Sequence, residues 1–283
     1  MPFIVPLATA QADYPDYNFV AALTPSEQKA AFHVQNANGD DLCLKIIAPN
    51  YSIDRLQREI DALQTINHPN VVGLKEYTYS STPTVKRHFM VEDFVAGADL
   101  ADMLIVGQPW QRPEVAAFFT QLADGLNALY AAKIVHRDLK PNNIRVRPNG
   151  DPVIIDFGLA RHLDKIDLTA TADGAGFGTP MYFAPEQFIG TKRDIDNRTD
   201  YFALGIIMYQ ALIGYHPFSH AMGSRQQLSD AVCMSDQHLQ TPEFNALPNQ
   251  WKLLVSKLLE RERSKRIQQA SQISTILQKI GGI

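Results

Sequence analysis

The residues best equipped for chemistry lie in the run HRDLKPNN at positions 136–143, inside the longer stretch IVHRDLKPNNI. Eight positions hold an imidazole, a guanidinium, a carboxylate, an ammonium and two amides. Burying such groups is costly unless they are paired or used. The run is therefore either a solvated loop or a site that needs an acid, a cation and an amide together.

The composition is that of a folded protein large enough for one domain or two small lobes. The 283 residues are 45% apolar and 20% charged, unlike a disordered chain. The net charge of -4 offers no basic surplus, so nucleic acid and anionic membranes are not expected partners. Cys43 and Cys233 lie far apart and suggest no disulfide framework, which favours a reducing compartment.

Nothing in the chain predicts a membrane span or a cleaved signal. No apolar run has the length of a span. The start, MPFIVPLATAQA, lacks the basic residues of a signal peptide, and Pro6 interrupts its short apolar stretch. We expect a soluble cytoplasmic protein, while delivery into another cell and the oligomeric state stay open.

The first third of the chain reads as short strands with one helix. Alternation in a strand at 40–47 places Lys45 on the face opposite Leu44. A helix at 52–66, capped by Ser52, carries Glu59 on its apolar face. A carboxylate that faces inward needs a cation, and Lys45 is the natural candidate.

The rest of the chain reads as mainly helical. After a strand at 88–95, the pattern predicts a long helix at 112–133, a hairpin at 144–155 around Asn149-Gly150, and a buried helix at 199–214. A strand-rich front and a helical back predict two lobes with a cleft between them.

Separated motifs follow one another in a fixed order: Lys45, Glu59, HRDLKPNN (136–143), DFG (156–158) and GTPMYFAPE (178–186). This ordered set resembles the eukaryotic-type serine/threonine protein kinase family, with a bacterial member as one candidate, over nearly the whole chain. The resemblance implies an α+β bilobal fold with a small antiparallel β-sheet N-lobe, one main helix in that lobe, and a larger helical C-lobe. A single kinase domain would fill residues 1–283, divided into an N-lobe at about 14–93, a hinge at about 93–99 and a C-lobe at about 100–283.

The resemblance also implies transfer of the ATP γ-phosphate to Ser or Thr hydroxyls of protein substrates. ATP and Mg²⁺ would be the cofactors, with Mn²⁺ as a substitute. Asp138 would orient the acceptor hydroxyl and take its proton, and Lys140 would steady the γ-phosphate. Asn143 and Asp156 would hold the metal. His136, at the start of the motif, would be structural.

Nucleotide contacts come from the N-lobe in such enzymes. Lys45 would grip the α- and β-phosphates, fixed by Glu59. Cys43 stands where a small residue covers adenine, although an inert thiol is the simpler reading. Backbone groups of Asp93 and Val95 would read adenine. Glu92, just before them, is unusual and could bond adenine or a neighbouring side chain and narrow access to the pocket behind.

Two features imply a serine or threonine acceptor rather than tyrosine, namely Lys140 and the GTPMY segment. Regulation would involve Arg137 and Arg161, which form a basic pocket for a phosphorylated activation-loop residue in related kinases. Thr169 and Thr171 are the candidate acceptors for self-phosphorylation, whereas Thr179 would be architectural.

Other matching residues would be structural. Glu186 would pair with Arg266, Asp200 would brace the catalytic loop, and His216 would be packed or solvated.

The loop that covers the nucleotide departs from the family, which has three glycines there so that backbone N–H groups can approach phosphate. Here residues 23–34 read LTPSEQKAAFHV, with Thr24, Ser26 and Lys29 in place of the glycines. Pro25 removes one further N–H donor. Either the side chains of Ser26 or Lys29 contact phosphate, or the loop is degenerate and nucleotide affinity is lowered.

Two alternative functions compete with an active kinase. A non-catalytic kinase-like scaffold would explain the glycine-free loop. A small-molecule phosphotransferase of the antibiotic-kinase kind shares the H-x-D-x-x-x-x-N pattern but lacks the GTPxYxAPE segment. Because the residues that handle metal and phosphate are present, an active serine/threonine kinase is the favoured reading.

Overall fold

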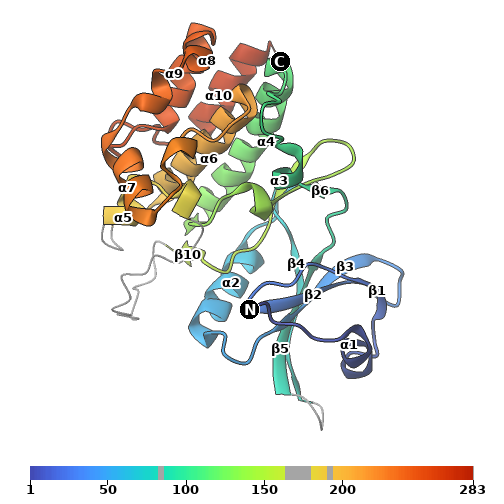
Figure 1. Cartoon of the computed structure of the whole chain (residues 1–283). Helices are drawn as coiled ribbons and strands as arrows, with labels where there is room; N and C mark the ends of the chain where they lie inside the picture. Colours follow the sequence, from blue (N-terminus) through green and yellow to red (C-terminus); the bar gives the residue numbers. More distant parts are fainter. Residues whose placement is uncertain (82–85, 163–179, 190–193, 283) are drawn as a thin grey trace.

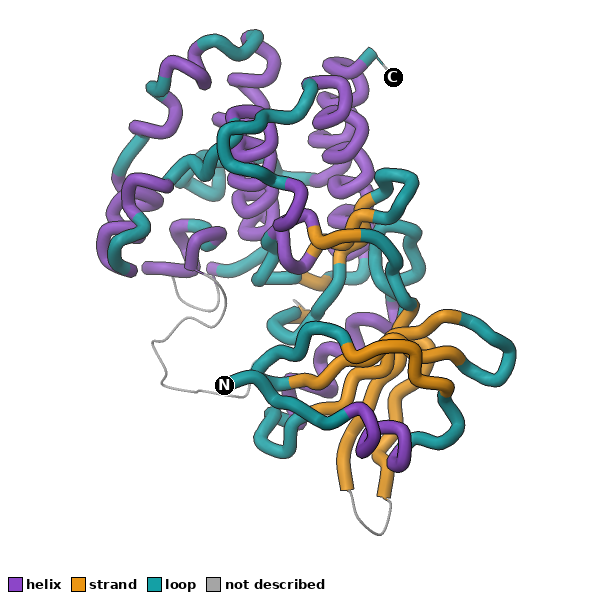
Figure 2. Tube along the Cα trace, turned by 45° about the vertical axis from the view of Figure 1, so that its right-hand side comes forward, coloured by secondary structure: helices purple, strands orange, loops and turns teal. Residues whose placement is uncertain are grey.

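The computed structural model describes residues 1–81, 86–162, 180–189 and 194–282. These residues form two lobes that are connected around residues 94–99 (Figure 1). Strands dominate one lobe and helices the other (Figure 2). The predicted bilobal α+β architecture is confirmed.

An antiparallel five-stranded sheet in the order β1-β2-β3-β5-β4 forms the N-lobe. Its strands are β1 (Asn18–Ala22), β2 (Lys29–Gln35), β3 (Asp41–Ile47), β4 (Leu74–Ser81) and β5 (Lys86–Asp93). In β3, Leu42 and Leu44 are buried, while Cys43 and Lys45 lie on the other face, as the alternation predicts. The register pairs Ala31 of β2 with Lys45, so this face of β3 continues across β2.

The main N-lobe helix, α2 (Ile53–Thr65), packs on the inner side of the sheet. Ser52 occupies the N-cap position, but its side chain makes no capping hydrogen bond. The apolar face predicted for this helix is buried, and Glu59 is buried with it. The helix therefore carries a carboxylate into the interior.

The N-terminal segment covers the opposite face of the sheet, which the sequence did not predict. Val5, Ala10 and Tyr14 pack there with sheet residues that include Phe32 and Phe89. The short helix α1 (Leu7–Asp13) lies on this face, and the sheet separates it from α2 (Figures 1 and 2). The sheet is thus covered on both sides.

Helices α4 and α6 form the centre of the C-lobe, with α10 packed on α4 and α9 packed on α6. The predicted buried helix is confirmed, because α6 is buried nearly all round and ends at Gly214, whose φ is +90°. Within the described ranges, no helix has both the length and the hydrophobicity needed to cross a membrane. The helices are α3 (Leu100–Met103), α4 (Arg112–Ala131), α5 (Pro185–Ile189), α6 (Asn197–Ile213), α7 (Arg225–Met234), α8 (Pro242–Asn245), α9 (Asn249–Leu258) and α10 (Ala270–Gly281).

Short strands frame the polar run between the lobes. The predicted hairpin is confirmed, with Gly150 at a φ of +90° in its turn. Run 136–143 connects β7 to β8, and Asp156 lies between β9 and β10. The two ladders therefore bring these segments together. Their strands are β6 (Ala98–Asp99), β7 (Ile134–Val135), β8 (Ile144–Val146), β9 (Pro152–Ile154) and β10 (Arg161–His162).

Candidate active site

Asp138 is the centre of the polar run. The ammonium of Lys140 lies 2.7 Å from its Oδ2 atom. The side-chain amide of Asn143 donates to the same oxygen at 3.1 Å and to the Asp138 carbonyl at 2.8 Å. An acid, a cation and an amide are thus joined in one contact network, and the solvated-loop alternative is wrong.

The backbone of this run is held in a strained conformation. Arg137 has a φ of +70°, in a region that non-glycine residues rarely occupy. The carboxylate of Asp200 accepts the N–H groups of His136 and Arg137, both at 2.8 Å. The predicted bracing role of Asp200 is confirmed. Strain of this kind costs on the order of 1–3 kcal/mol and persists only where surrounding bonds impose it.

His136 connects the run to the DFG segment. Its ring is fully buried, accepts the Asp138 N–H at 3.3 Å, and donates from Nε2 to the Ile155 carbonyl at 3.1 Å. It also meets the Phe157 ring edge-on. With both ring nitrogens engaged in backbone contacts, the imidazole positions these two segments rather than serving as a base.

Asp156 lies on the segment between β9 and β10, next to the polar run. The Ile155 N–H donates to the Asn143 carbonyl at 2.9 Å, which places the aspartate beside the run. Asp156 has a φ of +62°, and its Oδ1 accepts the Gly158 N–H at 3.3 Å. The two predicted metal-binding residues therefore come together.

The predicted pairing of Lys45 with Glu59 is wrong. Glu59 forms its ion pair with Lys29 of β2, and Lys29 also lies 3.2 Å from Oδ1 of Asp156. Lys45 instead pairs with Glu92 of β5, at 2.6 Å. Lys29, at the position where the family resemblance places a loop glycine, provides Glu59 with a second buried cation.

Charge interactions keep Lys29, Lys45 and Asp156 ionised, whereas burial raises the pKa of Glu59. Burial alone lowers the pKa of Lys29, but the carboxylates of Asp156 and Glu59 outweigh it and raise that pKa well above its ordinary value. Lys29 in turn holds the pKa of Asp156 well below its usual range, against the effect of burial. The pKa of Lys45 is raised because Glu92 outweighs desolvation. Both lysines are therefore charged at neutral pH.

The backbone of the glycine-free loop is engaged in its own hydrogen bonds. The Ser26 hydroxyl accepts the N–H groups of Gln28 and Lys29, at 3.2 and 3.0 Å. The Ser26 N–H donates to the Lys29 carbonyl, and the Phe3 N–H donates to the Ser26 carbonyl at 2.7 Å. Ser26 thus organises the turn, and the N-terminal segment fastens it to the sheet.

Tyr51 contacts the buried pair of Lys29 and Glu59, a role that was not predicted from the sequence. Its hydroxyl lies 3.4 Å from Glu59 and donates to the Gly158 carbonyl at 3.3 Å. Its ring lies below the Lys29 ammonium. The sequence carried no signal for this role, because an aromatic residue before a helix is ordinary.

Arg145 was also missed, and it fixes the connection between the lobes. Its guanidinium donates to the carbonyls of Val95 and Gly97 and pairs with Asp99 at 2.8 Å. Gly97 is required there, because a Cβ atom would collide with the Val146 carbonyl. The segment predicted to read adenine is therefore held against β8.

Asp93 and Cys43, both predicted to line the adenine site, lie on neighbouring strands. Asp93 ends β5, where its N–H donates to the Gly73 carbonyl at 2.9 Å. Cys43 pairs with Glu92 across the two strands. Burial raises the pKa of the Cys43 thiol to about 11, which favours the inert reading of this residue.

A divalent metal fits the donors that the site offers. Asp156 provides a carboxylate kept ionised by Lys29, and Asn143 provides an amide oxygen, since its nitrogen is used on Asp138. Mg²⁺ prefers such hard oxygen donors and takes few protein ligands when phosphates supply the others.

The predicted regulatory residues are only partly described. Arg137 donates its backbone N–H to Asp200, and its carbonyl accepts from Gln187 at 3.0 Å. Arg161 begins β10, but its side chain lies outside the described residues. Thr169, Thr171 and Thr179 also lie outside them.

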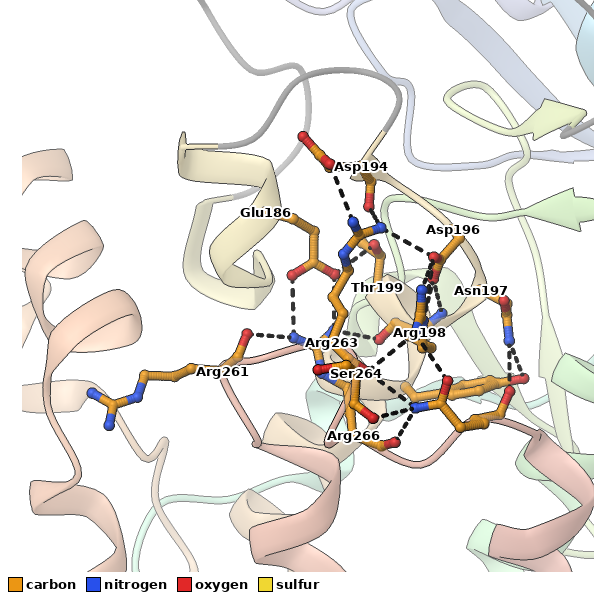
Figure 3. A network of polar contacts seen from close by, with 12 residues as sticks. Glu186, Asp194, Asp196, Asn197, Arg198, Thr199, Arg261, Arg263, Ser264 and Arg266 are labelled. Atoms are coloured by element: carbon orange, nitrogen blue, oxygen red, sulfur yellow. Dashed lines mark hydrogen bonds and ion pairs between the residues drawn. The ribbon is translucent and has the colours of Figure 1, made fainter.

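A polar network anchors the segment that follows the site (Figure 3). The predicted pair of Glu186 and Arg266 is confirmed, at 2.8 Å, with both side chains buried. Arg263 joins Asp194 and Asp196 at 3.1 Å. His216 is packed in the interior, where its Nε2 donates to the Met181 carbonyl at 2.9 Å.

The family model described as protein kinase domain matches residues 29–278. The chain is 32% identical over 218 residues to serine/threonine-protein kinase ULK3 of Homo sapiens, covering 76% of this chain and 43% of that protein. It is 33% identical over 179 residues to serine/threonine-protein kinase pkn3 of Myxococcus xanthus, covering 61% and 32%.

A third relative, CBL-interacting serine/threonine-protein kinase 24 of Arabidopsis thaliana, is 30% identical over 248 residues, covering 85% of this chain and 52% of the relative. The chain thus spans about a third to a half of the length of these relatives.

Proposed function

The chain belongs to the protein kinase family, and we propose on this premise that it transfers the γ-phosphate of ATP to serine or threonine hydroxyls of proteins. The observation that carries the proposal is the arrangement around Asp138, whose carboxylate contacts both Lys140 and Asn143 while Asn143 is bonded to the DFG segment. The acceptor class is supported by Lys140 and by relatives that are named serine/threonine-protein kinases.

Each group then has a role in the transfer. Asp138 orients the acceptor hydroxyl and takes its proton as the oxygen attacks phosphorus, and Lys140 offsets charge on the transferring group. Asn143 and Asp156 would hold Mg²⁺, with Mn²⁺ as a substitute. When bound, the metal neutralises phosphate charge that develops in the transition state.

We include self-phosphorylation in this proposal. Thr169 or Thr171 is the acceptor, and a phosphate there would pair with Arg137 and Arg161 to order the loop. The variant Thr169→Ala, Thr171→Ala should lower activity toward a protein substrate and remove the corresponding phosphopeptide in a mass spectrum. Unchanged activity would show that these threonines do not control the enzyme.

The transfer itself is tested with purified protein, labelled ATP, Mg²⁺ and a generic protein substrate. Asp138→Asn should reduce incorporation at least about 100-fold, because acid–base catalysis by a positioned side chain contributes roughly that much. Asp102→Asn, on the exposed side of α3, is the matched control and should match wild type. ATP binding without incorporation in wild type would instead support the non-catalytic scaffold.

A further inference from the structure

We propose that Lys29, and not Lys45, is the lysine that contacts the nucleotide phosphates, an inference that rests on the proposed kinase function. Lys45 and Glu92 then form a separate buried pair that takes no part in phosphate binding. The division follows from the contacts of the two lysines and from the loop that precedes Lys29.

The Lys29 ammonium lies next to Asp156, the carboxylate expected to hold the metal. Lys29 lies between Glu59 and Asp156, with only 7% of its side chain exposed. Phosphates held by a metal on Asp156 must lie close to that carboxylate, and so close to Lys29. Lys29 lies on the same face of the sheet as Lys45, since Ala31, two residues after Lys29, pairs with Lys45.

Lys45 could reach phosphate only by leaving its buried partner Glu92. Glu92 has a side chain only 2% exposed and pairs with Lys45 at 2.6 Å. Its other oxygen, Oε1, has no hydrogen-bond partner among the described residues. If Lys45 turned toward phosphate, Glu92 would be left as an uncompensated buried charge, which is strongly unfavourable. Lys29 is also paired with a buried carboxylate, Glu59, but its ammonium already faces Asp156, so contact with phosphate does not require that pair to break.

The loop before Lys29 offers few backbone N–H groups to phosphate. In a glycine-rich loop, backbone N–H groups contact the phosphates. Here Ser26 occupies the N–H groups of Gln28 and Lys29, and Pro25 has none. A side-chain cation at the end of the loop supplies the positive charge that the backbone withholds. The positive charge of Lys29 thus compensates for the glycine-free backbone of the loop.

The two lysines are separated by comparing ATP with adenosine, which lacks phosphates. Both affinities are measured by calorimetry, once with Mg²⁺ and once with EDTA. Lys29→Gln should weaken ATP about ten-fold or more, equivalent to about 1.4 kcal/mol, and change adenosine by less than about two-fold. Lys29→Arg, which keeps the charge, should retain at least about a third of the wild-type preference for ATP.

The matched control is the double variant Lys45→Gln, Glu92→Gln, which removes both charges and leaves two amides able to bond each other. It should keep the ratio of ATP to adenosine affinity within about three-fold of wild type. Because the ratio is the readout, a general loss of stability affects both ligands and does not imitate the effect.

The proposal is supported only if the ratio falls in Lys29→Gln and stays in the double variant. A fall in the double variant, or an unchanged ratio in Lys29→Gln, overturns it. These outcomes leave the kinase function standing, since ATP still binds to wild type. Wild-type protein that binds neither ligand would contradict the proposed function as well.

Discussion

Lys29 and Glu59 form an ion pair in the interior of the N-lobe, with 7% and 0% of their side chains exposed. The pair ties the start of β2 to the middle of α2 and holds Asp156 through the same ammonium. The Lys29 ammonium therefore links β2, α2 and the segment after β9.

Breaking this pair from one side should be costly. Lys29→Met leaves two carboxylates beside an apolar side chain and should lower the free energy of unfolding by about 3–5 kcal/mol. Urea unfolding checks the value. The control is Lys75→Met, because Lys75 pairs with Asp93 at 2.8 Å on the surface and should lose less than about 1 kcal/mol. Similar losses in both variants would mean that the Lys29 contacts add little.

Tyr14 offers a test of the covered outer face. Its ring packs edge-on against Phe89, at 4.8 Å between centroids, and only 5% of the residue is exposed. Its hydroxyl is buried without a hydrogen-bond partner among the described residues. Tyr14→Ala should cost about 3–5 kcal/mol, comparable to other large aromatic truncations. Tyr14→Phe should be neutral or stabilising by about 1 kcal/mol, since it removes an unsatisfied polar group.

Thermal unfolding of the two Tyr14 variants tests whether packing of the Tyr14 ring on the sheet stabilises the protein. If Tyr14→Ala melts at the same temperature as wild type, the Tyr14 ring does not stabilise the sheet, whereas an unchanged or slightly raised melting temperature is the expected result for Tyr14→Phe.

Arg266 should tolerate no substitution by lysine. Its guanidinium donates to both oxygens of Glu186 and to the carbonyls of Arg198, Glu260 and Arg261. A lysine cannot reproduce this planar fork, so Arg266→Lys should cost about 3 kcal/mol or more. Arg261→Lys is the control, because its pair with Asp236 lies half exposed and should matter little. Equal melting temperatures of the two variants would contradict the importance of the buried network.

Acid should destabilise the C-lobe through His216. Burial lowers the pKa of this histidine from 6.5 to about 4 in the folded protein. The unfolded chain then takes up a proton at higher pH than the folded chain, so the contribution is complete above pH 6.5 and is lost as the pH falls toward 4. The full effect is about 3 kcal/mol.

Unfolding measured between pH 7 and 4 tests this. His216→Gln should flatten the decline in stability, whereas His220→Gln, at an exposed position, should leave it unchanged. A decline of the same steepness in His216→Gln would assign the acid sensitivity to other groups.

The catalytic loop was predictable because its chemistry is local. HRDLKPNN and DFG each fix their residue types within a few positions, and the hairpin around Gly150 joins them. The buried pair of Glu186 and Arg266, 80 residues apart, was predictable only through the family resemblance. Alternation in β3 and the inward position of Glu59 on α2 also followed from periodicity.

The partner of Glu59 could not be derived in this way. Periodicity placed a carboxylate inside, but two lysines on neighbouring strands could reach it, and strand register decides between them. Glu92 was expected to bond adenine or a neighbouring side chain, and Lys45 is such a neighbour, but no local pattern identified it as the partner. The outer covering by Val5, Ala10 and Tyr14 was missed for a similar reason, because a short apolar segment acquires its role only through tertiary packing.

A crystal structure with Mg²⁺ and a non-hydrolysable ATP analogue would show which lysine contacts the phosphates. We expect the Lys29 ammonium within about 3 Å of a phosphate oxygen, the metal on Asp156 and Asn143, and Lys45 still paired with Glu92. The opposite arrangement, with Lys45 on the phosphates and paired to Glu59 while Lys29 points away, would contradict this expectation.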